Sequence, residues 1–390
     1  MKIQEVILKA MAGQLKWWEA AEIIGITDRT MRRWRERYQE HGYSGLWDHR
    51  KRSPSPKRVA VAVLEQVLQL YREKYFDFNV RHFHEKLLEE HGIRQSYTWV
   101  KKALQESGLV ARRRKRGTHR RRRPRRPLPG MMLHIDASEH AWFGDGRKYE
   151  LMVILDDATS EIYYAQLVEA EGTRSVMAGL REVIETRGVF CSLYSDRAGH
   201  FFLTPKGQAT VDKTRLTQVG RALNELGIRM IAAYSPQARG RSERNFGTWQ
   251  GRLPQELRVR GITALDQANE FLRQEYVAEF NRRFRVAAAQ KGTAFVRSTH
   301  RDLDVIFSVQ QERTVNQDNT IQAGNCVYQI EKTRWRNTLA GATVVLHQHL
   351  DGRVSIRYGP HVIAEYAPDQ LPPQAPRRRG TPRLPVGRAA

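Results

Sequence analysis

The spacing of hydrophobic residues changes twice along the chain and divides it into three kinds of segment. As far as about residue 110, apolar residues recur at helical intervals, with glycines and capping residues between the runs. Between residues 131 and 170 they form three short strand-like runs separated by polar turns. Helical and strand-like runs then alternate to about Phe284, and short strand-like runs resume after residue 310. This order predicts N-terminal all-α domains, a central α/β core with a mixed sheet, and a small C-terminal β-barrel.

Within the first 50 residues, two helices separated by a glycine have the pattern of a helix-turn-helix. An apolar helix with Trp18 on its packed side ends at Gly25, and Thr27 is placed to cap the next helix. Met31 and Trp34 share one face of that second helix, which is the helix that enters the major groove in such motifs. A small helical bundle with solvated arginines is the alternative. The DNA contacts expected from this helix are Arg29, Arg32, Arg33 and Arg35.

A second group of helices follows a linker of proline, serine and basic residues, "KRSPSPKR" at 51–58. Three more helical segments lie between residues 59 and 106, and Gly92 and Gly108 end two of them. They predict a second helical DNA-binding domain, with a plain spacer as the alternative.

The charge of the chain indicates a polyanionic partner. Lysine and arginine total 66 against 42 aspartates and glutamates, a net charge of +24. Such an excess is informative about partners rather than about fold, and nucleic acid is the first candidate. No run of about 18 apolar residues supports a membrane-spanning helix. The only cysteines, Cys191 and Cys326, are too few for a zinc site or a disulfide framework. We therefore expect a reducing, cytoplasmic, nucleoid-associated location, no membrane partner, and Cys191 packed as a small apolar side chain.

The densest positive charge is the run "RRRKRGTHRRRRPRR" at 112–126, with eleven lysines and arginines in fifteen residues. A block of like charge repels itself and is disordered when free. It predicts an arm that lies along DNA phosphates and releases their counterions, and a solvated linker is the alternative. The phosphate contacts expected from this arm are Arg112, Arg113, Arg114, Lys115, Arg116, Arg121, Arg122 and Arg123.

Three acidic residues occur where a phosphoryl-transfer site would be built. Such sites use divalent metals held by a few carboxylates. Asp136 lies in "LHIDAS", and strand alternation places it on one face with His134 and Ser138. Asp196 ends the strand "CSLYSD", and ligand sites in open α/β sheets gather where strands end. Glu243 follows the strand "IRMIAAYSP" on a predicted helix.

Glu243 stands among arginines in "YSPQARGRSERNF", and two interpretations of it are open. A surface ion pair with Arg239, four residues earlier, would stabilise a helix by only about 0.3–0.5 kcal/mol. Alternatively, Glu243 is a metal ligand, and Arg239, Arg241 and Arg244 contact DNA phosphates beside it.

Four neighbouring residues invite a functional interpretation that simpler roles also explain. Asp156 and Asp157 end a strand at a turn, where aspartate caps the backbone, and we interpret both as structural. His134 is expected to pack or to support the site by a hydrogen bond. His200 lies near Asp196 in the sequence, and its role stays open.

Three segments, "HIDAS", "YSDRAGHF" and "SPQARGRSERNF", resemble the signature segments of DDE transposases with an integrase core. The S-P-x-x-x-G-x-x-E form around Glu243 is the most specific. The likeness is greatest to the ISNCY group of bacterial insertion-sequence transposases, in which helix-turn-helix domains precede the core and a small β-barrel follows it. It extends from about Leu15 to Tyr366, and "FNRRFRVAAA" resembles the segment that ends the core. In departure from the pattern, His200 stands where many relatives carry an acid, and residues 202–213 lengthen the interval before Glu243.

The resemblance implies a ribonuclease-H-like core in which Asp136, Asp196 and Glu243 hold two Mg²⁺ ions, or Mn²⁺. It implies an enzyme that binds double-stranded inverted-repeat ends, cuts their 3′ ends and joins them to target DNA, as at least a dimer on DNA. Two rivals are a non-catalytic DNA-binding protein on the same fold and a metal-dependent nuclease that does not join. The presence of all three acids disfavours the first rival, and paired helix-turn-helix units disfavour the second.

The expected domains are a helix-turn-helix domain (1–50), a linker (51–58), a second helical DNA-binding domain (59–110), a basic arm (111–130), the catalytic core (131–286), a linker (287–310), the β-barrel (311–367) and a disordered basic tail (368–390).

Overall fold

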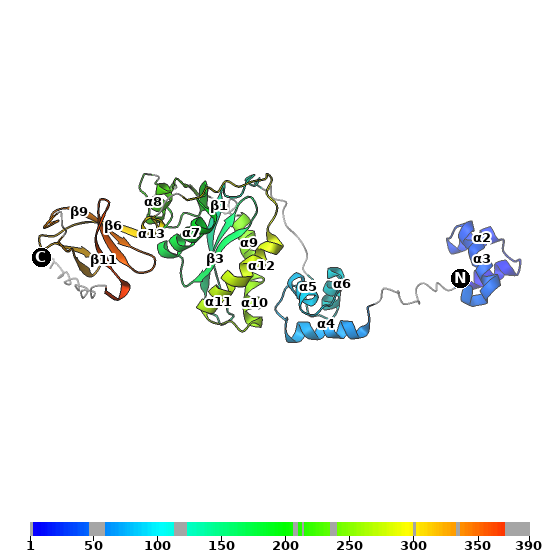
Figure 1. Ribbon diagram of the computed structural model, residues 1–390. Helices are drawn as coiled ribbons and strands as arrows, with labels where there is room; N and C mark the ends of the chain where they lie inside the picture. The colour runs from blue at the N-terminus through cyan, green and yellow to red at the C-terminus, as the bar shows by residue number, and fades with distance from the viewer. Residues whose placement is uncertain are drawn as a thin grey trace, which may run out of the picture. The chain divides into compact units, whose positions relative to one another are not determined.

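The structure is a computed structural model that describes residues 3–46, 59–112, 123–205, 210–212, 214–234, 240–298, 302–332 and 336–370 (Figure 1). The chain divides into two compact units, residues 1–70 and 71–390. Helix α4 (Val61–Glu73) crosses the division between them. The linker predicted at 51–58, most of the basic arm and almost all of the tail lie outside the described residues. Among the helices that are described, none has the length and apolar character needed to cross a membrane.

The first unit contains the predicted helix–glycine–helix pattern. Its elements are α1 (Ile3–Met11), α2 (Trp17–Ile24), α3 (Asp28–His41) and the 3-10 turn η1 (Gly42–Leu46). Gly25 ends α2 at a φ of 75°, a left-handed conformation that glycine adopts without strain. Thr27 caps α3, because its Oγ1 accepts the backbone N–H of Thr30 at 3.4 Å.

The packed side of α2 differs from the prediction by one residue. Ala20 and Ala21 are buried, and Trp17 and Ile24 pack against the same cluster. Trp18, which we expected inside, is 53% exposed. Positions 17, 20, 21 and 24 follow one face of a helix, and residue 18 lies off that face.

The second unit begins with a small helical segment, made of the end of α4, α5 (Val80–Glu89) and α6 (Tyr97–Glu106). Asn79 and Ser96 cap α5 and α6, and each side-chain oxygen accepts a backbone N–H three residues later. Aromatic and aliphatic side chains close its core, namely Tyr71, Tyr75, Phe78, Phe83, Leu87, Val100 and Leu104.

The central core contains a five-stranded mixed sheet, as predicted, in the order β3-β2-β1-β4-β5. The strands are β1 (Leu133–His140), β2 (Tyr149–Asp156), β3 (Ile162–Val168), β4 (Ser192–Ser195) and β5 (Arg229–Ala232). Strands β1 to β3 form an antiparallel meander, and β4 pairs in parallel with both β1 and β5. Parallel pairing needs crossover connections, which here contain α7 (Thr173–Arg187) and α8 (Gln218–Glu225).

Both faces of this sheet are covered, because apolar residues point both ways from β2. Met152 and Ile154 join a cluster with α7 and α8, whereas Leu151, Val153 and Leu155 join a second cluster on the other face (Figure 1). The second cluster includes α9 (Gly240–Gln250), α10 (Leu253–Val259), α11 (Leu265–Phe271), the π-helical turn η4 (Leu272–Tyr276) and α12 (Val277–Phe284).

Two longer helices were predicted in that second layer, and one of them is interrupted. The first breaks between α9 and α10, where Gly251 follows α9 and Pro254 lies in the first turn of α10. Proline lacks the N–H that a helix interior needs, so it is placed best at a helix start. The second is continuous from α11 to α12 through the π-helical turn.

The exposed edge of β3 is closed by two asparagines from the helical layer. The side chain of Asn269 bonds to both backbone groups of Leu167, at 2.7 and 2.9 Å. Asn281 does the same for Ile162, at 2.7 and 2.8 Å. An open strand edge is a template for unwanted pairing, and these side chains occupy it.

The expected C-terminal β-barrel is wrong, because the sheet does not close. Strands β6 (Val309–Thr314), β9 (Thr343–Gln348), β10 (Val354–Tyr358) and β11 (His361–Tyr366) form an open four-stranded sheet in the order β11-β10-β9-β6. A separate hairpin of β7 (Thr320–Ala323) and β8 (Cys326–Gln329) shares its apolar core. Alternating strands look alike in a barrel and in an open sheet, and only pairing between the edge strands distinguishes them.

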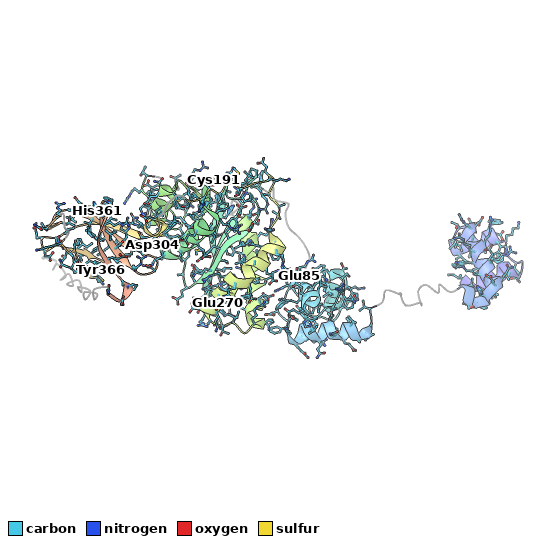
Figure 2. All side chains as sticks on the ribbon, viewed as in Figure 1. Glu85, Cys191, Glu270, Asp304, His361 and Tyr366 are labelled. Atoms are coloured by element: carbon cyan, nitrogen blue, oxygen red, sulfur yellow. The ribbon has the colours of Figure 1, made fainter. Side chains whose placement is uncertain are left out.

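A short helix, α13 (Leu303–Ile306), lies where this sheet meets the core. Its Asp304 accepts Arg181 of α7 at 2.7 Å and Arg353, beside β10, at 2.6 Å (Figure 2). Cys191, also marked in Figure 2, is exposed rather than packed, which corrects our expectation. It immediately precedes β4, whose four residues are all buried, and therefore lies just outside the covered part of the sheet.

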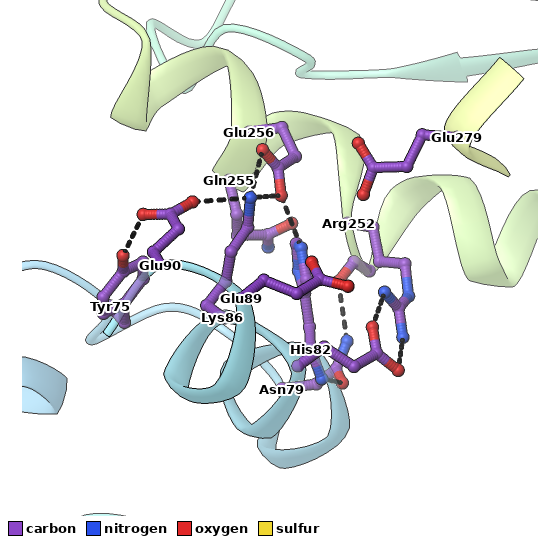
Figure 3. A network of polar contacts seen from close by, with 12 residues as sticks. Tyr75, Asn79, His82, Lys86, Glu89, Glu90, Arg252, Gln255, Glu256 and Glu279 are labelled. Atoms are coloured by element: carbon purple, nitrogen blue, oxygen red, sulfur yellow. Dashed lines mark hydrogen bonds and ion pairs between the residues drawn. The ribbon is translucent and has the colours of Figure 1, made fainter. Parts of the chain in front are cut away.

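The helical segment of the second unit is fixed to α10 by a buried polar network (Figure 3). Glu256 of α10 is 1% exposed and lies 2.6 Å from Nε2 of His82 and 2.9 Å from Nζ of Lys86. Beside it, Arg252 pairs with Glu85 at 2.7 Å. The outer pairs of the same contact are Arg283–Glu85, Arg283–Glu89 and Arg258–Asp77.

The ionisation of this network is set by burial and by its hydrogen bonds. Burial disfavours the charge on Glu256, but the bonds from His82 and Lys86 outweigh burial and hold its pKa at about 2. Burial lowers the pKa of His82 in spite of Glu256. Within the described residues, Nδ1 of His82 has no hydrogen-bond partner, which fits a neutral ring that donates from Nε2.

Acidification is expected to loosen this contact. When the pH is below 6.5, the ordinary pKa of histidine, His82 binds a proton in the undocked state more readily than in the docked state. The stability of the docked state therefore decreases as the pH is lowered through this range. The contribution of Glu256 is present above its ordinary pKa of 4.5 and is lost as the pH falls toward 2. Hydrogen exchange of the α5 amides, corrected for intrinsic rates, should show weaker protection at pH 5.5 than at pH 7.5. Equal protection at both pH values would contradict the expectation.

Replacing Glu256 by glutamine should destabilise the second unit strongly. The change removes the buried carboxylate that pairs with both His82 and Lys86, and among the described residues Lys86 keeps only Glu90, at 2.9 Å. Loss of one partner of a buried ion pair typically costs about 3–5 kcal/mol. The matched control is Glu106→Gln, which removes a carboxylate from an exposed pair with Lys102 and should cost at most about 1 kcal/mol. Urea unfolding of both variants measures the difference, and equal midpoints would refute the role of the network.

Candidate active site

Asp136 lies on β1, and Asp196 immediately follows β4, the strand that pairs in parallel with β1. The parallel register pairs Leu133 with Leu193 and His134 with Tyr194, and each aspartate comes two residues after the second of these pairs. Asp136 is buried, and Asp196 is half-buried and begins a turn by accepting the N–H of Ala198 at 2.9 Å. The two aspartates singled out in the sequence therefore follow the same pair of residues on two hydrogen-bonded strands.

Glu243 lies in the first turn of α9, which runs along the polar face of β1. At one end of α9, Arg241 pairs with Asp157, the carboxylate that also accepts His134 of β1. At the other end, Nε2 of Gln250 donates to Oγ of Ser138 at 2.9 Å. Residues 241 and 250 are about 14 Å apart along a helix axis, and residues 134 and 138 are about 13 Å apart along a strand. The two contacts are therefore compatible with α9 lying along β1.

Glu243 lies on α9 between the two residues whose contacts are described, Arg241 and Gln250. Glu243, Gly247 and Gln250 share one face of α9, and the last of them touches β1. The side chain of Glu243 is exposed.

Asp157 is fully buried and gathers donors from several elements. Its Oδ1 accepts Nε2 of His134 at 2.7 Å, Nη2 of Arg123 at 2.5 Å and Nη1 of Arg241. Its Oδ2 accepts the backbone N–H of Arg126 at 2.7 Å. Burial alone would raise the pKa of Asp157, but the His134 bond, the Arg126 N–H and the Arg241 charge together hold that pKa well below its usual range.

The neighbouring acid and histidine behave as the sequence suggested. Asp156 is buried and caps the turn after β2, where it accepts the N–H of Thr159 at 2.8 Å. The same carboxylate accepts the N–H of Gly130 at 2.9 Å. Burial lowers the pKa of His134, so its ring is neutral and donates to Asp157. Nε2 of His200 lies 3.5 Å from a carboxylate oxygen of Glu171.

The donor set suits a hard divalent cation, although its members are not gathered. Carboxylate oxygens are the ligands that Mg²⁺ prefers, and Asp136, Asp196 and Glu243 would each supply them. Across the described part of the chain, no three His, Cys, Asp or Glu side chains lie close enough together to hold one ion. The three acids therefore do not form a complete ligand set in this structure.

The predicted DNA-contacting arginines fall into three groups. Those on α3, Arg29, Arg32, Arg33 and Arg35, are exposed as expected, and Arg35 lies over the ring of Trp17. Arg112 and Arg244 are exposed, whereas Arg123 and Arg241 are paired with Asp157. The remaining ones lie outside the described residues, namely Arg113, Arg114, Lys115, Arg116, Arg121, Arg122 and Arg239. The predicted Arg239–Glu243 ion pair falls there too.

Family models match the N-terminal part of the chain. A helix-turn-helix domain model matches residues 4–55, which include α1 to α3. A homeodomain-like domain model matches residues 30–104. Both describe DNA-binding folds, in agreement with the helix–glycine–helix pattern and the capped helices.

Similarity to whole proteins decides the family. A putative transposase of Sinorhizobium fredii (strain NBRC 101917 / NGR234), y4bF, is 30% identical over 371 residues, which cover 92% of this chain and 79% of the relative. The chain belongs to the transposase family. The transposase for insertion sequence IS1202 of Streptococcus pneumoniae is 28% identical over 318 residues, covering 72% of this transposase and 67% of the relative. The resemblance to DDE transposases is therefore confirmed.

Solved structures overlap the transposase less closely. The catalytic core domain of HTLV-2 integrase in complex with magnesium is 18% identical, covers 38% of this chain and 90% of its own, and has a TM-score of 0.28. A simian T-cell lymphotropic virus intasome in complex with the PP2A regulatory subunit B56 gamma is 13% identical, covers 80% and 100% of the two chains, and has a TM-score of 0.32.

The sequence alone missed two parts of this arrangement. It assigned Asp157 to the turn, whereas the carboxylate collects four donors. It gave no role to Gln250, which ties α9 to β1. A signal for Asp157 existed in the two consecutive aspartates at a strand end, one more than a turn cap needs. No pattern indicates Gln250, because its partner lies 112 residues away.

Exposed arginines of α3 are expected to contribute to DNA affinity through phosphate contact. Arg33→Ala should weaken binding and reduce the slope of log K against log salt by about 0.9, the value for one neutralised phosphate. Gln39→Ala, an exposed neutral position on the same helix, is the control and should leave the slope unchanged. Mobility shifts at several salt concentrations measure both variants. An unchanged slope for Arg33→Ala would exclude that contact.

Proposed function

We propose that this transposase binds the inverted-repeat ends of its element, cuts each 3′ end and joins it to target DNA. The observation that supports the proposal is the parallel pairing of β1, which carries Asp136, with β4, which Asp196 follows, in a chain of the transposase family. Glu243 is proposed as the third acid, because α9 runs along the face that carries Asp136. The proposed assembly on DNA is at least a dimer, since two ends must be joined. Its proposed place in the cell is the bacterial nucleoid.

The proposed chemistry is two successive phosphoryl transfers. Water attacks the phosphorus at the end of the element, the bond to the element's 3′ oxygen breaks, and that oxygen leaves as a free 3′-OH. This 3′-OH then bonds to a phosphorus of target DNA, where the bond to the target's own 3′ oxygen breaks. No covalent bond between protein and DNA is required.

The proposed role of the chain's residues is to bind, orient and neutralise. Two Mg²⁺ ions, or Mn²⁺, would supply activation of the attacking oxygen and stabilisation of the leaving one. Asp136, Asp196 and Glu243 would hold them with carboxylate oxygens. The burial of Asp136 within the sheet gives that side chain a rigid base, which such a site needs. The helix-turn-helix segments would select the DNA end.

Substitution of the acids separates this proposal from its rivals. Asp136→Asn and Glu243→Gln should still bind end DNA but should cleave and join it about 1,000-fold more slowly or worse, because several kcal/mol of charge stabilisation is lost. The substrate is labelled DNA from beside the gene, incubated with target plasmid and Mg²⁺. Glu139→Gln is the matched control, since Glu139 lies on β1 and pairs with Lys148 at the surface.

Each outcome selects one interpretation. If the wild-type chain cuts and joins and both variants do neither, the three-acid proposal stands. If Glu243→Gln joins ends at the wild-type rate, Glu243 is a surface residue and the third acid lies elsewhere. If the wild type cuts but never joins, the chain acts as a nuclease, and if it only binds, it is a non-catalytic DNA-binding protein.

A further inference from the structure

Each of the three candidate acids follows, by two positions, a residue that belongs to one cluster around Asp157. His134 precedes Asp136 and donates to Asp157 at 2.7 Å. Arg241 precedes Glu243 and pairs with the same oxygen. Tyr194 precedes Asp196, and its ring lies 5.1 Å from that of His134, centre to centre.

Arg123 completes the cluster and connects it to the basic arm. Its guanidinium donates to Asp157 at 2.5 Å and lies 5.8 Å from the centre of the Tyr194 ring. The arm is fixed at three further points, because Arg125 donates to Asp157 O at 3.0 Å and Ser160 Oγ at 2.8 Å, and Arg126 donates its N–H to Asp157. The end of the arm is therefore bound to the same turn as the cluster.

On a strand and on a helix, a separation of two residues determines whether two side chains point in the same direction. On β1 and β4, residues two apart share a face about 7 Å apart, so fixing His134 and Tyr194 fixes the aspartates beyond them. On α9, Arg241 and Glu243 point in different directions, so Arg241 holds the backbone of the first turn without blocking Glu243. The buried carboxylate of Asp157 therefore contacts β1 and α9 directly, and it contacts β4 indirectly through the packing of His134 against Tyr194.

We propose that Asp157 is a positioning residue of the transposase, which through His134, Arg241 and Arg123 sets the relative places of the strands and helix that carry the three acids. This inference rests on the proposed function of those acids. Asp157 touches neither DNA nor metal in this role. It acts through the groups it holds, and the arm bound at Arg123–Arg126 is a fourth part of the same arrangement.

The test compares Asp157→Asn with wild type in three measurements. Asparagine keeps the size of the side chain but removes the charge that Arg123 and Arg241 share. We expect the affinity for end DNA to change by less than about threefold. The kcat for cleavage should fall, and the Kd for Mn²⁺ should rise, each by about 10–100-fold, which is the range for groups that orient metal ligands. Mn²⁺ affinity is measured by electron paramagnetic resonance without DNA, so it does not depend on activity.

Asp304→Asn is the matched control for loss of an arginine-paired carboxylate. Asp304 also receives two arginines, Arg181 and Arg353, but it lies at the C-terminal sheet. It should leave Mn²⁺ affinity and kcat unchanged. If Asp157→Asn does not fold, Arg241→Gln replaces it, because Arg241 is partly exposed and its substitution is less disruptive. Arg241→Lys keeps the positive charge, and it should restore part of the Mn²⁺ affinity that Arg241→Gln loses.

The outcomes distinguish this inference from the proposed function. If Asp136→Asn abolishes cleavage while folded Asp157→Asn, or Arg241→Gln in its place, binds Mn²⁺ and cleaves like wild type, the positioning role is refuted and the three-acid proposal stands. If Asp136→Asn cleaves like wild type, the proposed function itself fails. If Asp304→Asn impairs Mn²⁺ binding as much as Asp157→Asn does, the effect is one of general stability, and the inference is overturned.

Discussion

The constraint on which the core depends is the need to neutralise one buried carboxylate. An ionised aspartate in a protein interior costs many kcal/mol unless donors surround it. Asp157 is fully buried, and its donors come from β1, from α9 and from the segment that leads into the core. Satisfying a single charge therefore brings together elements that are far apart in sequence. Any arrangement that separated these elements would strip donors from a buried charge, which is why such a cluster has few alternatives.

The same physical logic fixes the helical segment that precedes the core. Glu256 is as buried as Asp157, and its partners His82 and Lys86 come from α5 (Figure 3). Exposed ion pairs of this kind would add little stability, whereas breaking a buried one leaves an uncompensated charge, so the pair disfavours other docking geometries. The contact uses α5 and leaves Lys101 and Lys102 of α6 exposed.

Local patterns predicted much of the fold because they depend on neighbours in sequence. The cap at Thr27, the glycine at the end of α2 and the alternation that put His134 and Asp136 on one face all involve residues within a few positions of one another. The predictions that failed depend instead on which surfaces of an element meet a neighbouring element. Trp18 and Trp17 differ only in which side of α2 meets a neighbour. The expected barrel failed because closure depends on whether two edge strands pair, and the alternation of each strand is the same in either case.

For this transposase, the sequence by itself determined the order of helical, α/β and β segments, the likeness of three acidic segments to a known family, and the basic charge that indicates DNA. These follow from residue type and spacing, which need no knowledge of contacts. Tertiary structure alone decided that β1 pairs in parallel with β4, that Gln250 ties α9 to β1, and that Arg123 and Arg241 meet at Asp157. The ion pairs of Arg123 and Arg241 with Asp157 join residues 34 and 84 positions apart along the chain. Their energies depend on burial, a property that no short stretch of sequence contains.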